Sequence, residues 1–263
     1  MFLKEDIKKQ LEKFSIAKGR VVTLHTSMRA VGEVEGGAEG LLSVLIDYFA
    51  KDGGLLCVPT HAWNGTVYDM NKNESCIGIL PIIAAGHPDG VRTVHPTHSM
   101  AVFGEKGRVE EFIKDEGAVD SPTNPKGCYG KIYDEDGYIL LIGVGHNKNT
   151  YLHCVEEMLG VTRRFRKDKV ERTVIHKDGR VEKRYIYWFD SSKVPDVSAY
   201  FVKLEPAFRY HGCIIDGHIG NAPVQLCNAR KMKEVVELIY KNNNDEELMH
   251  DYDPIDESLY RIP

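Results

Sequence analysis

The chain lacks the signals of several protein classes. Its six cysteines form no Cys-x-x-Cys pair and no tight cluster, which disfavours a zinc knuckle or a disulfide framework and favours reduced thiols. The longest apolar run, around residues 138–145, is too short for a membrane span, and the charged N-terminus is unlike a signal peptide. The net charge of -5 argues against nucleic acid as a partner. We therefore expect a cytoplasmic protein that binds neither membrane nor nucleic acid.

Two phosphate-binding motifs are absent as well. The segment from Leu24 to Glu39 joins hydroxyl residues at a strand end to a glycine-rich stretch, but it contains neither Gly-x-Gly-x-x-Gly nor a Gly-Lys-Ser/Thr signature. Side-chain and backbone donors at such a corner can still hold an anionic or amide-bearing ligand. A loop with helix N-cap residues explains the same pattern about as well.

Apolar segments alternate with helical patterns along most of the chain. We expect an amphipathic opening helix, and the remaining pattern predicts strands at 20–25, 54–59 and 138–145 and helices at 41–50 and 230–241. This order predicts an α/β fold with a mixed central sheet flanked by helices, in a single domain over residues 1–241. Alternation about Lys177-Asp-Gly179 predicts a β-hairpin insertion at about 169–189. Residues 242–263 are expected to form a peripheral, acidic C-terminal extension.

The most informative residues are His153 and Glu156, which follow the third predicted strand. An apolar run, then Gly and Asn, then helix-permissive residues predict a buried strand that turns into a helix. On that helix His153, Glu156 and Glu157 share one face. An imidazole backed by a carboxylate at such a junction can serve as a general base, although a lone His-x-x-Glu is also common on solvated surfaces. Adjacent helical residues point about 100° apart, so Cys154 is expected to be core packing.

A second group of candidate residues lies in His95-Pro-Thr-His98-Ser99. Pro96 disfavours a helix that presents both histidines to a metal, and no neighbouring Asp or Glu offers a third ligand. We predict no bound metal and a loop that lines the cleft, with a structural turn as the alternative. The rival enzyme class is a metal-dependent hydrolase that would use His95, His98, His146 and His153.

Several spaced segments, taken in order, resemble the aminoglycoside N3-acetyltransferase family. The resemblance spans residues 5–240, and no single short motif would suffice. Its segments are His25-x-Ser27 with Ala30-Val-Gly32, Arg92-x-x-His95-Pro-x-x-Ser99, Ser121-Pro122, Asn147-x-x-Thr150-x-x-His153-x-x-Glu156 and Ile219-Gly220-Asn221-Ala222. His98 and Met100 depart from the family pattern, and the loop at 64–76 is short.

The resemblance implies an α/β fold distinct from the GNAT acetyltransferases and acetyl-coenzyme A (acetyl-CoA) as cosubstrate. It implies an acceptor at the 3-amino group of a 2-deoxystreptamine antibiotic, with His153 as general base and Glu156 as its carboxylate partner. Coenzyme contacts are expected from His25, Thr26, Ser27, Val31, Gly32, Arg92 and Ser99. Acceptor contacts are expected from Thr150, Glu157, Asp120 and His95, although a solvated surface explains the two carboxylates as well.

Two further functions stay open on the sequence. One keeps the acetyl transfer but uses a different amine, such as an amine of a natural-product pathway. The other is a coenzyme-binding protein without turnover, which the presence of both His153 and Glu156 argues against. The sequence does not define the acceptor, the biological role or the oligomer, for which a homodimer is one alternative.

Overall fold

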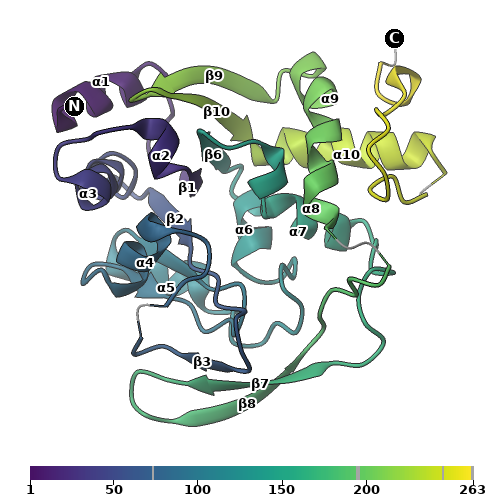
Figure 1. The fold of residues 1–263 in the computed structure, drawn as a ribbon, viewed down its shortest axis with the longest axis horizontal. Helices are drawn as coiled ribbons and strands as arrows, with labels where there is room; N and C mark the ends of the chain where they lie inside the picture. The colour runs from purple at the N-terminus through teal and green to yellow at the C-terminus, as the bar shows by residue number, and fades with distance from the viewer. Residues whose placement is uncertain (73, 194–195, 245, 262–263) are drawn as a thin grey trace.

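A seven-stranded mixed sheet forms the centre of the protein (Figure 1). The structure is a computed structural model that describes residues 1–72, 74–193, 196–244 and 246–261. The strand order is β4-β5-β2-β1-β6-β10-β9. The bounds are β1 Val21–Thr26, β2 Leu55–Pro59, β4 Val91–Arg92, β5 Met100–Phe103, β6 Tyr138–Ile142, β9 Ile214–Ile219 and β10 Ala222–Asn228. Strand β1 runs parallel to β2 and β6, and the outer pairs are antiparallel, so the predicted mixed sheet is confirmed.

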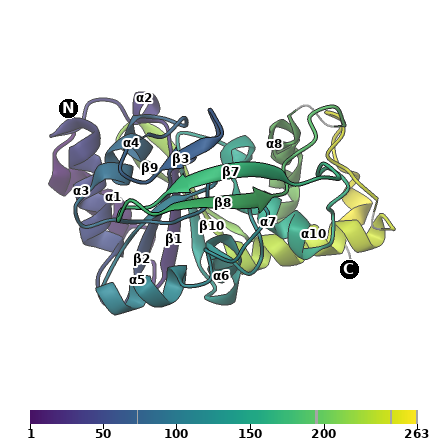
Figure 2. The same ribbon diagram turned by 90° about the horizontal axis from the view of Figure 1, so that it is seen from below.

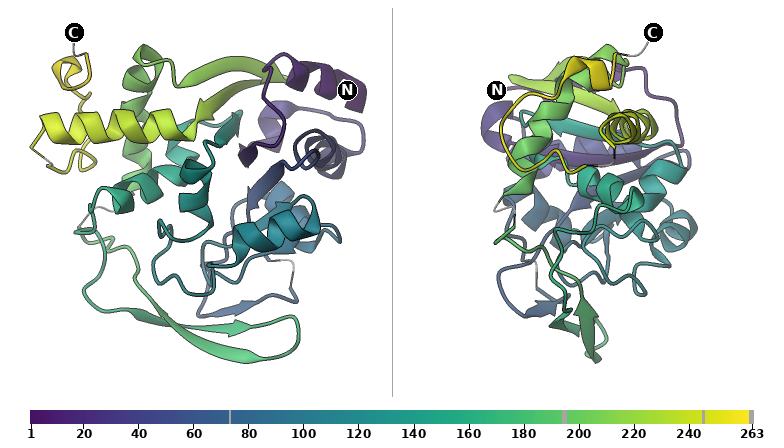
Figure 3. Two further views of the ribbon diagram at one scale, coloured as in Figure 1. Left: turned by 180° about the vertical axis from the view of Figure 1, so that it is seen from behind. Right: turned by 90° about the vertical axis from the view of Figure 1, so that its right-hand side faces the viewer.

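Helices cover both faces of this sheet, and the central strands are therefore apolar on both sides. In β1, Val21 packs into one hydrophobic cluster, whereas Val22 and Leu24 pack into the other. The second cluster is covered by α1 (Lys4–Glu12), α2 (Met28–Val31), α3 (Gly37–Phe49) and α4 (Ile79–Gly86). The first is covered by α5 (Lys106–Ile113), α6 (Cys128–Asp134), α7 (Tyr151–Met158) and α10 (Ala229–Asn242), as Figure 3 shows from behind.

A smaller sheet confirms the predicted hairpin. Strands β7 (Val170–Ile175) and β8 (Val181–Ile186) pair antiparallel, and β3 (Val67–Asp69) adds a parallel third strand. Figure 2 shows β7 and β8 side by side across the lower side of the molecule. None of the helices in the described ranges is long and apolar enough to cross a membrane.

Five further helical segments are short. They are η1 (His146–Lys148), α8 (Val197–Tyr200), η2 (Phe201–Leu204), α9 (Glu205–Tyr210) and, near the C-terminus, η3 (Glu257–Leu259). Helix α7 begins at Tyr151, because a 3-10 turn, η1, first carries the chain away from β6.

The segment after α10 does not lie wholly at the periphery as the sequence predicts. Met249, Ile255 and Tyr260 are buried in the same hydrophobic cluster as α10 and α7. Burying three large side chains explains why this charged segment folds back on the domain (Figure 1). The proposed division at residue 241 stays a prediction.

Candidate functional site

A cavity of about 390 Å³ opens where the three parallel strands end. His25 and Thr26 contribute from the end of β1, Val58 and Pro59 from the end of β2, and Val144 from the segment after β6. The loops that follow parallel strands converge at this edge, which is where open α/β sheets bind their ligands. The cavity is therefore the candidate functional site.

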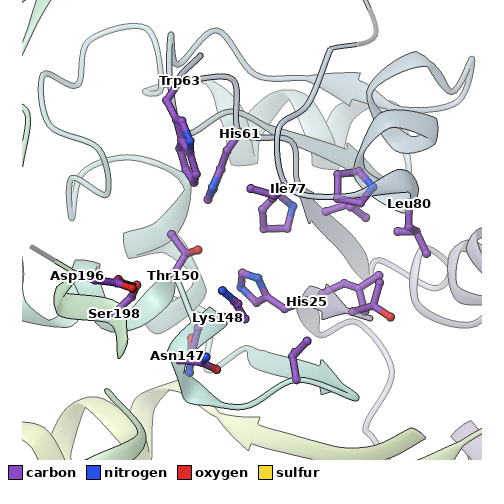
Figure 4. A pocket seen from close by; sticks show the side chains of 17 residues that line it. His25, His61, Trp63, Ile77, Leu80, Asn147, Lys148, Thr150, Asp196 and Ser198 are labelled. Atoms are coloured by element: carbon purple, nitrogen blue, oxygen red, sulfur yellow. Dashed lines mark hydrogen bonds between the residues drawn. The ribbon is translucent and has the colours of Figure 1, made fainter. Parts of the chain in front are cut away.

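Polar side chains from three loops line the rest of the cavity (Figure 4). Among the lining residues that the structure describes, Lys148 is the one ammonium group and Asp196 the one carboxylate. Burial lowers the pKa of His61 well below its usual value, so this imidazole is neutral at pH 7. The cavity therefore carries almost no net charge. The other polar or aromatic lining residues of these loops are Trp63, Asn147, Asn149, Thr150 and Ser198.

Two residues at the end of β1 line the cavity and carry buried, unsatisfied polar atoms. His25 is buried, and burial lowers its pKa to about 4. Within the described residues, His25 Nε2 and Thr26 Oγ1 are buried and have no hydrogen-bond partner. Such atoms lose free energy unless a ligand or water meets them, so this corner suits a ligand with amide groups. Ser27 does not join them, because its Oγ accepts a hydrogen bond from Ala30 N (3.3 Å) and caps α2.

His153 lies inside the protein, one helical turn beyond the cavity-lining Thr150. Its side chain is 11% exposed, and its ring lies 4.9 Å from the ring of Phe189 and 4.8 Å from that of Phe201, centre to centre. It is close enough to His61 for the charge of one ring to lower the pKa of the other. The structure thus places the predicted base next to the cavity wall.

Glu156 lies beside His153, as their spacing on a helix predicts. The distance from His153 Nδ1 to Glu156 Oε2 is 3.7 Å, longer than a hydrogen bond. Catalytic hydrogen bonds are often long before substrate binds. Glu156 also forms a buried ion pair with Arg164. Burial and the charge of Arg164 lower the pKa of His153 to about 3, so its imidazole is neutral at pH 7 and is a weak base in the structure without substrate.

A packed cluster of histidines lies behind the same wall. The ring centres of His61 and His98 are 4.5 Å apart, and those of His95 and His98 are 5.9 Å apart. His95 Nδ1 accepts hydrogen bonds from the backbone N–H groups of Thr97 (3.2 Å) and His98 (2.9 Å). Its Nε2 must therefore carry the hydrogen that Ser121 O accepts at 3.0 Å. These contacts hold the loop rather than line the cavity.

The histidines named for a metal-dependent hydrolase do not form one site. His146 packs against Phe208, with ring centres 5.0 Å apart, and its Nδ1 faces Asn149 Nδ2 at 3.2 Å. Over the described part of the chain, no three His, Cys, Asp or Glu side chains are grouped as metal ligands.

Two residues expected at the coenzyme are instead buried supports of a loop. Arg92 Nη1 donates to the carbonyl of Lys72 (2.8 Å), and Nη2 donates to those of Thr60 (3.1 Å) and Glu74 (2.5 Å). Ser99 Oγ also donates to Thr60 O (3.0 Å). Because these polar groups are satisfied within the protein, the structure does not support coenzyme contacts from Arg92 or Ser99.

Val31 and Gly32 are also structural. The side chain of Val31 is fully buried in the core, where a ligand does not reach it. Gly32 has a φ of +83°, and a Cβ there would lie 2.8 Å from Asn221 Nδ2. A tight turn against Asn221 therefore explains the glycine better than coenzyme binding does.

The predicted acceptor carboxylates face other parts of the protein. Glu157 accepts hydrogen bonds from Ser121 Oγ and from Thr123 N (3.1 Å), and burial raises its pKa. Asp120 pairs with Lys169 at 2.7 Å. Neither residue lines the cavity, nor does His95; Thr150 alone of the four predicted acceptor residues does.

Sequence reasoning missed several lining residues. His61 and Trp63 follow β2 directly, and Lys148 lies between β6 and α7. The position after each predicted parallel strand was the available signal for these three. Asp196 comes from the segment before α8, which no local pattern ties to the sheet.

Comparison with known proteins relates this geometry to one family. The sequence profile described as aminoglycoside 3-N-acetyltransferase matches residues 23–241. Curated relatives include the SPbeta prophage-derived aminoglycoside N(3')-acetyltransferase-like protein YokD of Bacillus subtilis (strain 168), which is 23% identical over 58% of this chain and 64% of its own length. Aminoglycoside N(3)-acetyltransferase IV of Salmonella sp is 30% identical over 58% of each chain. The chain thus spans about three fifths of the length of these relatives.

Solved structures share the fold along most of the chain. The apoenzyme of aminoglycoside acetyltransferase AAC(3)-IVa is similar with a TM-score of 0.77 and 22% identity, over 96% of this chain and 92% of the other. AAC-IIIb in a binary complex with CoASH gives a TM-score of 0.70 at 20% identity, over 88% of this chain and 93% of the other.

Proposed function

Because the chain belongs to the aminoglycoside 3-N-acetyltransferase family, we propose that it transfers an acetyl group from acetyl-CoA to an amino group. The observation that carries the proposal is the buried His153–Glu156 pair behind a cavity at the carboxyl edge of the sheet. A general base beside a ligand cavity is the arrangement that amine acylation needs. The CoASH complex of the similar protein AAC-IIIb supports the choice of cosubstrate.

The cavity fits the thioester end of the cosubstrate better than the whole molecule. At about 390 Å³ it lies near the lower end of small-molecule sites. His25 and Thr26 line the cavity, and a change of side-chain rotamer would bring their unpartnered Nε2 and Oγ1 atoms to the amide groups of a pantetheine arm. The ammonium group of Lys148 offers a charge partner for phosphate groups.

Six free thiols suit a reducing compartment, which supports a cytoplasmic location.

In the proposed reaction His153 takes the proton of the attacking amine. An aliphatic amine is protonated at pH 7, and only its neutral form attacks a carbonyl carbon. As the new C–N bond forms and the C–S bond of the thioester breaks, the amine nitrogen loses two protons in all: His153 Nε2 accepts one, and the other ends on the leaving sulfur. Glu156 faces Nδ1 and would hold the tautomer with a hydrogen on Nδ1 and a free lone pair on Nε2.

The acceptor that family membership favours is the 3-amino group of a 2-deoxystreptamine aminoglycoside. Similar proteins have been solved with a gentamicin, with apramycin and with sisomicin. One feature of this chain favours a second candidate. The described cavity lining holds one carboxylate, that of Asp196, and one ammonium group, that of Lys148, whereas a polycationic antibiotic is best held by several carboxylates. An amine with fewer positive charges is therefore the second candidate acceptor.

Thiol release from acetyl-CoA tests both the activity and the acceptor. The purified protein would be mixed with acetyl-CoA and, in separate reactions, with gentamicin, apramycin, sisomicin and a set of simple monoamines. If the protein transfers acetyl groups, the thiol of coenzyme A should be released together with an acetylated amine, which mass spectrometry detects. No transfer to any amine would reject the proposal, and transfer to monoamines alone would select the second candidate.

A further inference from the structure

The carboxylate that faces His153 is not free, because a buried arginine holds it. Arg164 follows α7 in the loop that leads to the hairpin, and its side chain is 5% exposed. Its Nη2 forms an ion pair with Glu156 Oε2, and its Nε lies 3.3 Å from Glu247 Oε2. One guanidinium therefore lies between two carboxylates that are far apart in the sequence.

Glu247 is fixed in place from several sides. Its Oε1 accepts hydrogen bonds from Tyr240 Oη (3.2 Å) and from the backbone N–H of Met249 (2.9 Å). Its side chain is 13% exposed. Its Oε2 lies 3.3 Å from Arg164 Nε and 4.0 Å from Nε of the half-exposed Arg163, so the carboxylate faces both guanidinium groups.

The segment that carries Glu247 is fastened to the domain. Lys203 Nζ donates to Leu248 O at 3.0 Å and pairs with Asp251 Oδ1 at 2.8 Å. His211 Nε2 lies 2.8 Å from Tyr260 O, so the far end of the segment is held as well. The family profile ends at residue 241, so Glu247 lies outside the matched region.

The charges of this cluster suit a transient imidazolium. The buried groups are the carboxylates of Glu156 and Glu247 and the guanidinium of Arg164, and the half-exposed Arg163 pairs with Glu247 from the solvent side, with its Nε 4.0 Å from Oε2. Water screens the charge of Arg163, so a proton on His153 would balance the charges of the three buried groups. The other charged or titratable groups around the ring are His61 and His98, both neutral because burial lowers their pKa.

We propose that Arg164 and Glu247 are positioning residues, through which the C-terminal segment orients Glu156 toward His153. Glu247 shares the guanidinium with Glu156 and so keeps Arg164 from neutralising that carboxylate completely. Glu156 Oε1 and His153 Nδ1 are both buried, and neither atom has a hydrogen-bond partner within the described residues. A small rotation would join the two atoms and fix the hydrogen on Nδ1. This role rests on the proposed function of His153 as the base.

The Glu247→Gln variant tests the proposal, because it removes one charge with little change of shape. With Glu247 neutral, Arg164 binds Glu156 alone and draws it from His153. The hydrogen of the ring then moves toward Nε2, which the ¹⁵N chemical shifts of His153 report at pH 7 without any substrate. We expect less of the Nδ1–H tautomer and a kcat lower on the order of tenfold, with KM for acetyl-CoA unchanged. Glu247→Asp keeps the charge and should restore most of both signals.

Glu246→Gln is the matched control, since Glu246 is exposed and one position away. This variant should leave the tautomer and kcat as in the wild type. Equal losses in Glu247→Gln and Glu247→Asp, or an unchanged tautomer in Glu247→Gln, would overturn the positioning role. A tautomer shift in Glu247→Gln together with full activity of a His153→Ala variant would support the positioning role and reject His153 as the base, so the two failures are distinguishable.

Discussion

Mild acid should destabilise this protein strongly, because its core holds neutral histidines. Burial is the main cause that lowers the pKa of His25 and His146 to about 4 and that of His95 to about 3. In the unfolded chain these rings take up protons near their usual pKa of 6.5. Because the pKa of each ring is lower in the folded than in the unfolded chain, the stability that these rings contribute is fully present above pH 6.5. It is lost as the pH falls toward 4.

The expected loss follows from these values. At pH 5.5 each such ring binds almost one proton more in the unfolded chain, which costs about 1.4 kcal/mol per ring and about 4 kcal/mol for three. Domains are stable by only about 5–15 kcal/mol, so this loss is large. Glu116 and Glu157 oppose it in part, because burial raises the pKa of each carboxyl group and favours protonation in the folded state.

Urea unfolding at pH 7.5, 6.5 and 5.5 measures this effect. His146→Leu should reduce the loss between pH 7.5 and 5.5 by about 1.4 kcal/mol, because it removes one buried ring that takes up a proton on unfolding. His218→Gln is the matched control, since His218 is exposed, and it should change nothing. A free energy of unfolding that is flat over this pH range in the wild type would refute the reasoning.

Two further predictions concern the loops around the site. Gly143→Ala should destabilise the fold by about 2–4 kcal/mol, because the backbone φ is +64° and the new Cβ would lie 2.4 Å from Ala30 Cβ. Gly179 lies at the open hairpin tip, so Gly179→Ala should cost only about 1–2 kcal/mol. Equal losses in urea unfolding would contradict the difference. Arg92→Lys should lower stability by about 2–4 kcal/mol, because it leaves buried carbonyls without donors, while KM for acetyl-CoA stays near the wild-type value. A selective rise in the KM for acetyl-CoA with unchanged stability would contradict this structural role and indicate that Arg92 contacts the coenzyme.

Local sequence patterns were sufficient to predict the three parallel strands at the centre of the sheet. The strands at 20–25, 54–59 and 138–145 are apolar runs between turn signals, and the structure contains β1, β2 and β6 there. The hairpin of β9 and β10 was not predicted, because Asp216 and Gly217 interrupt its apolar alternation. The turn at Gly220 and Asn221, with φ of +58° at the glycine, was the signal that could have found it.

In the site, too, local contacts could be predicted from the sequence and long-range contacts could not. His153 and Glu156 are three residues apart on a helix, so local geometry alone predicts that they meet. Arg164 and Glu247 meet only because the C-terminal segment folds back on the core, and no sequence spacing encodes that contact. The sequence does not separate a buried arginine that binds backbone carbonyls, as Arg92 does, from one that binds a ligand, so the coenzyme contact of Arg92 stays a prediction.

The most direct test of His153 as the general base is its replacement by alanine, with Cys154→Ala as the matched control. Both side chains lie on α7, and Cys154 is fully buried in the core. At saturating acetyl-CoA and amine, the rate of thiol release should fall by about 10²–10⁴-fold in His153→Ala and stay near the wild-type rate in Cys154→Ala. Turnover near the wild-type rate in a folded His153→Ala variant would contradict the assignment.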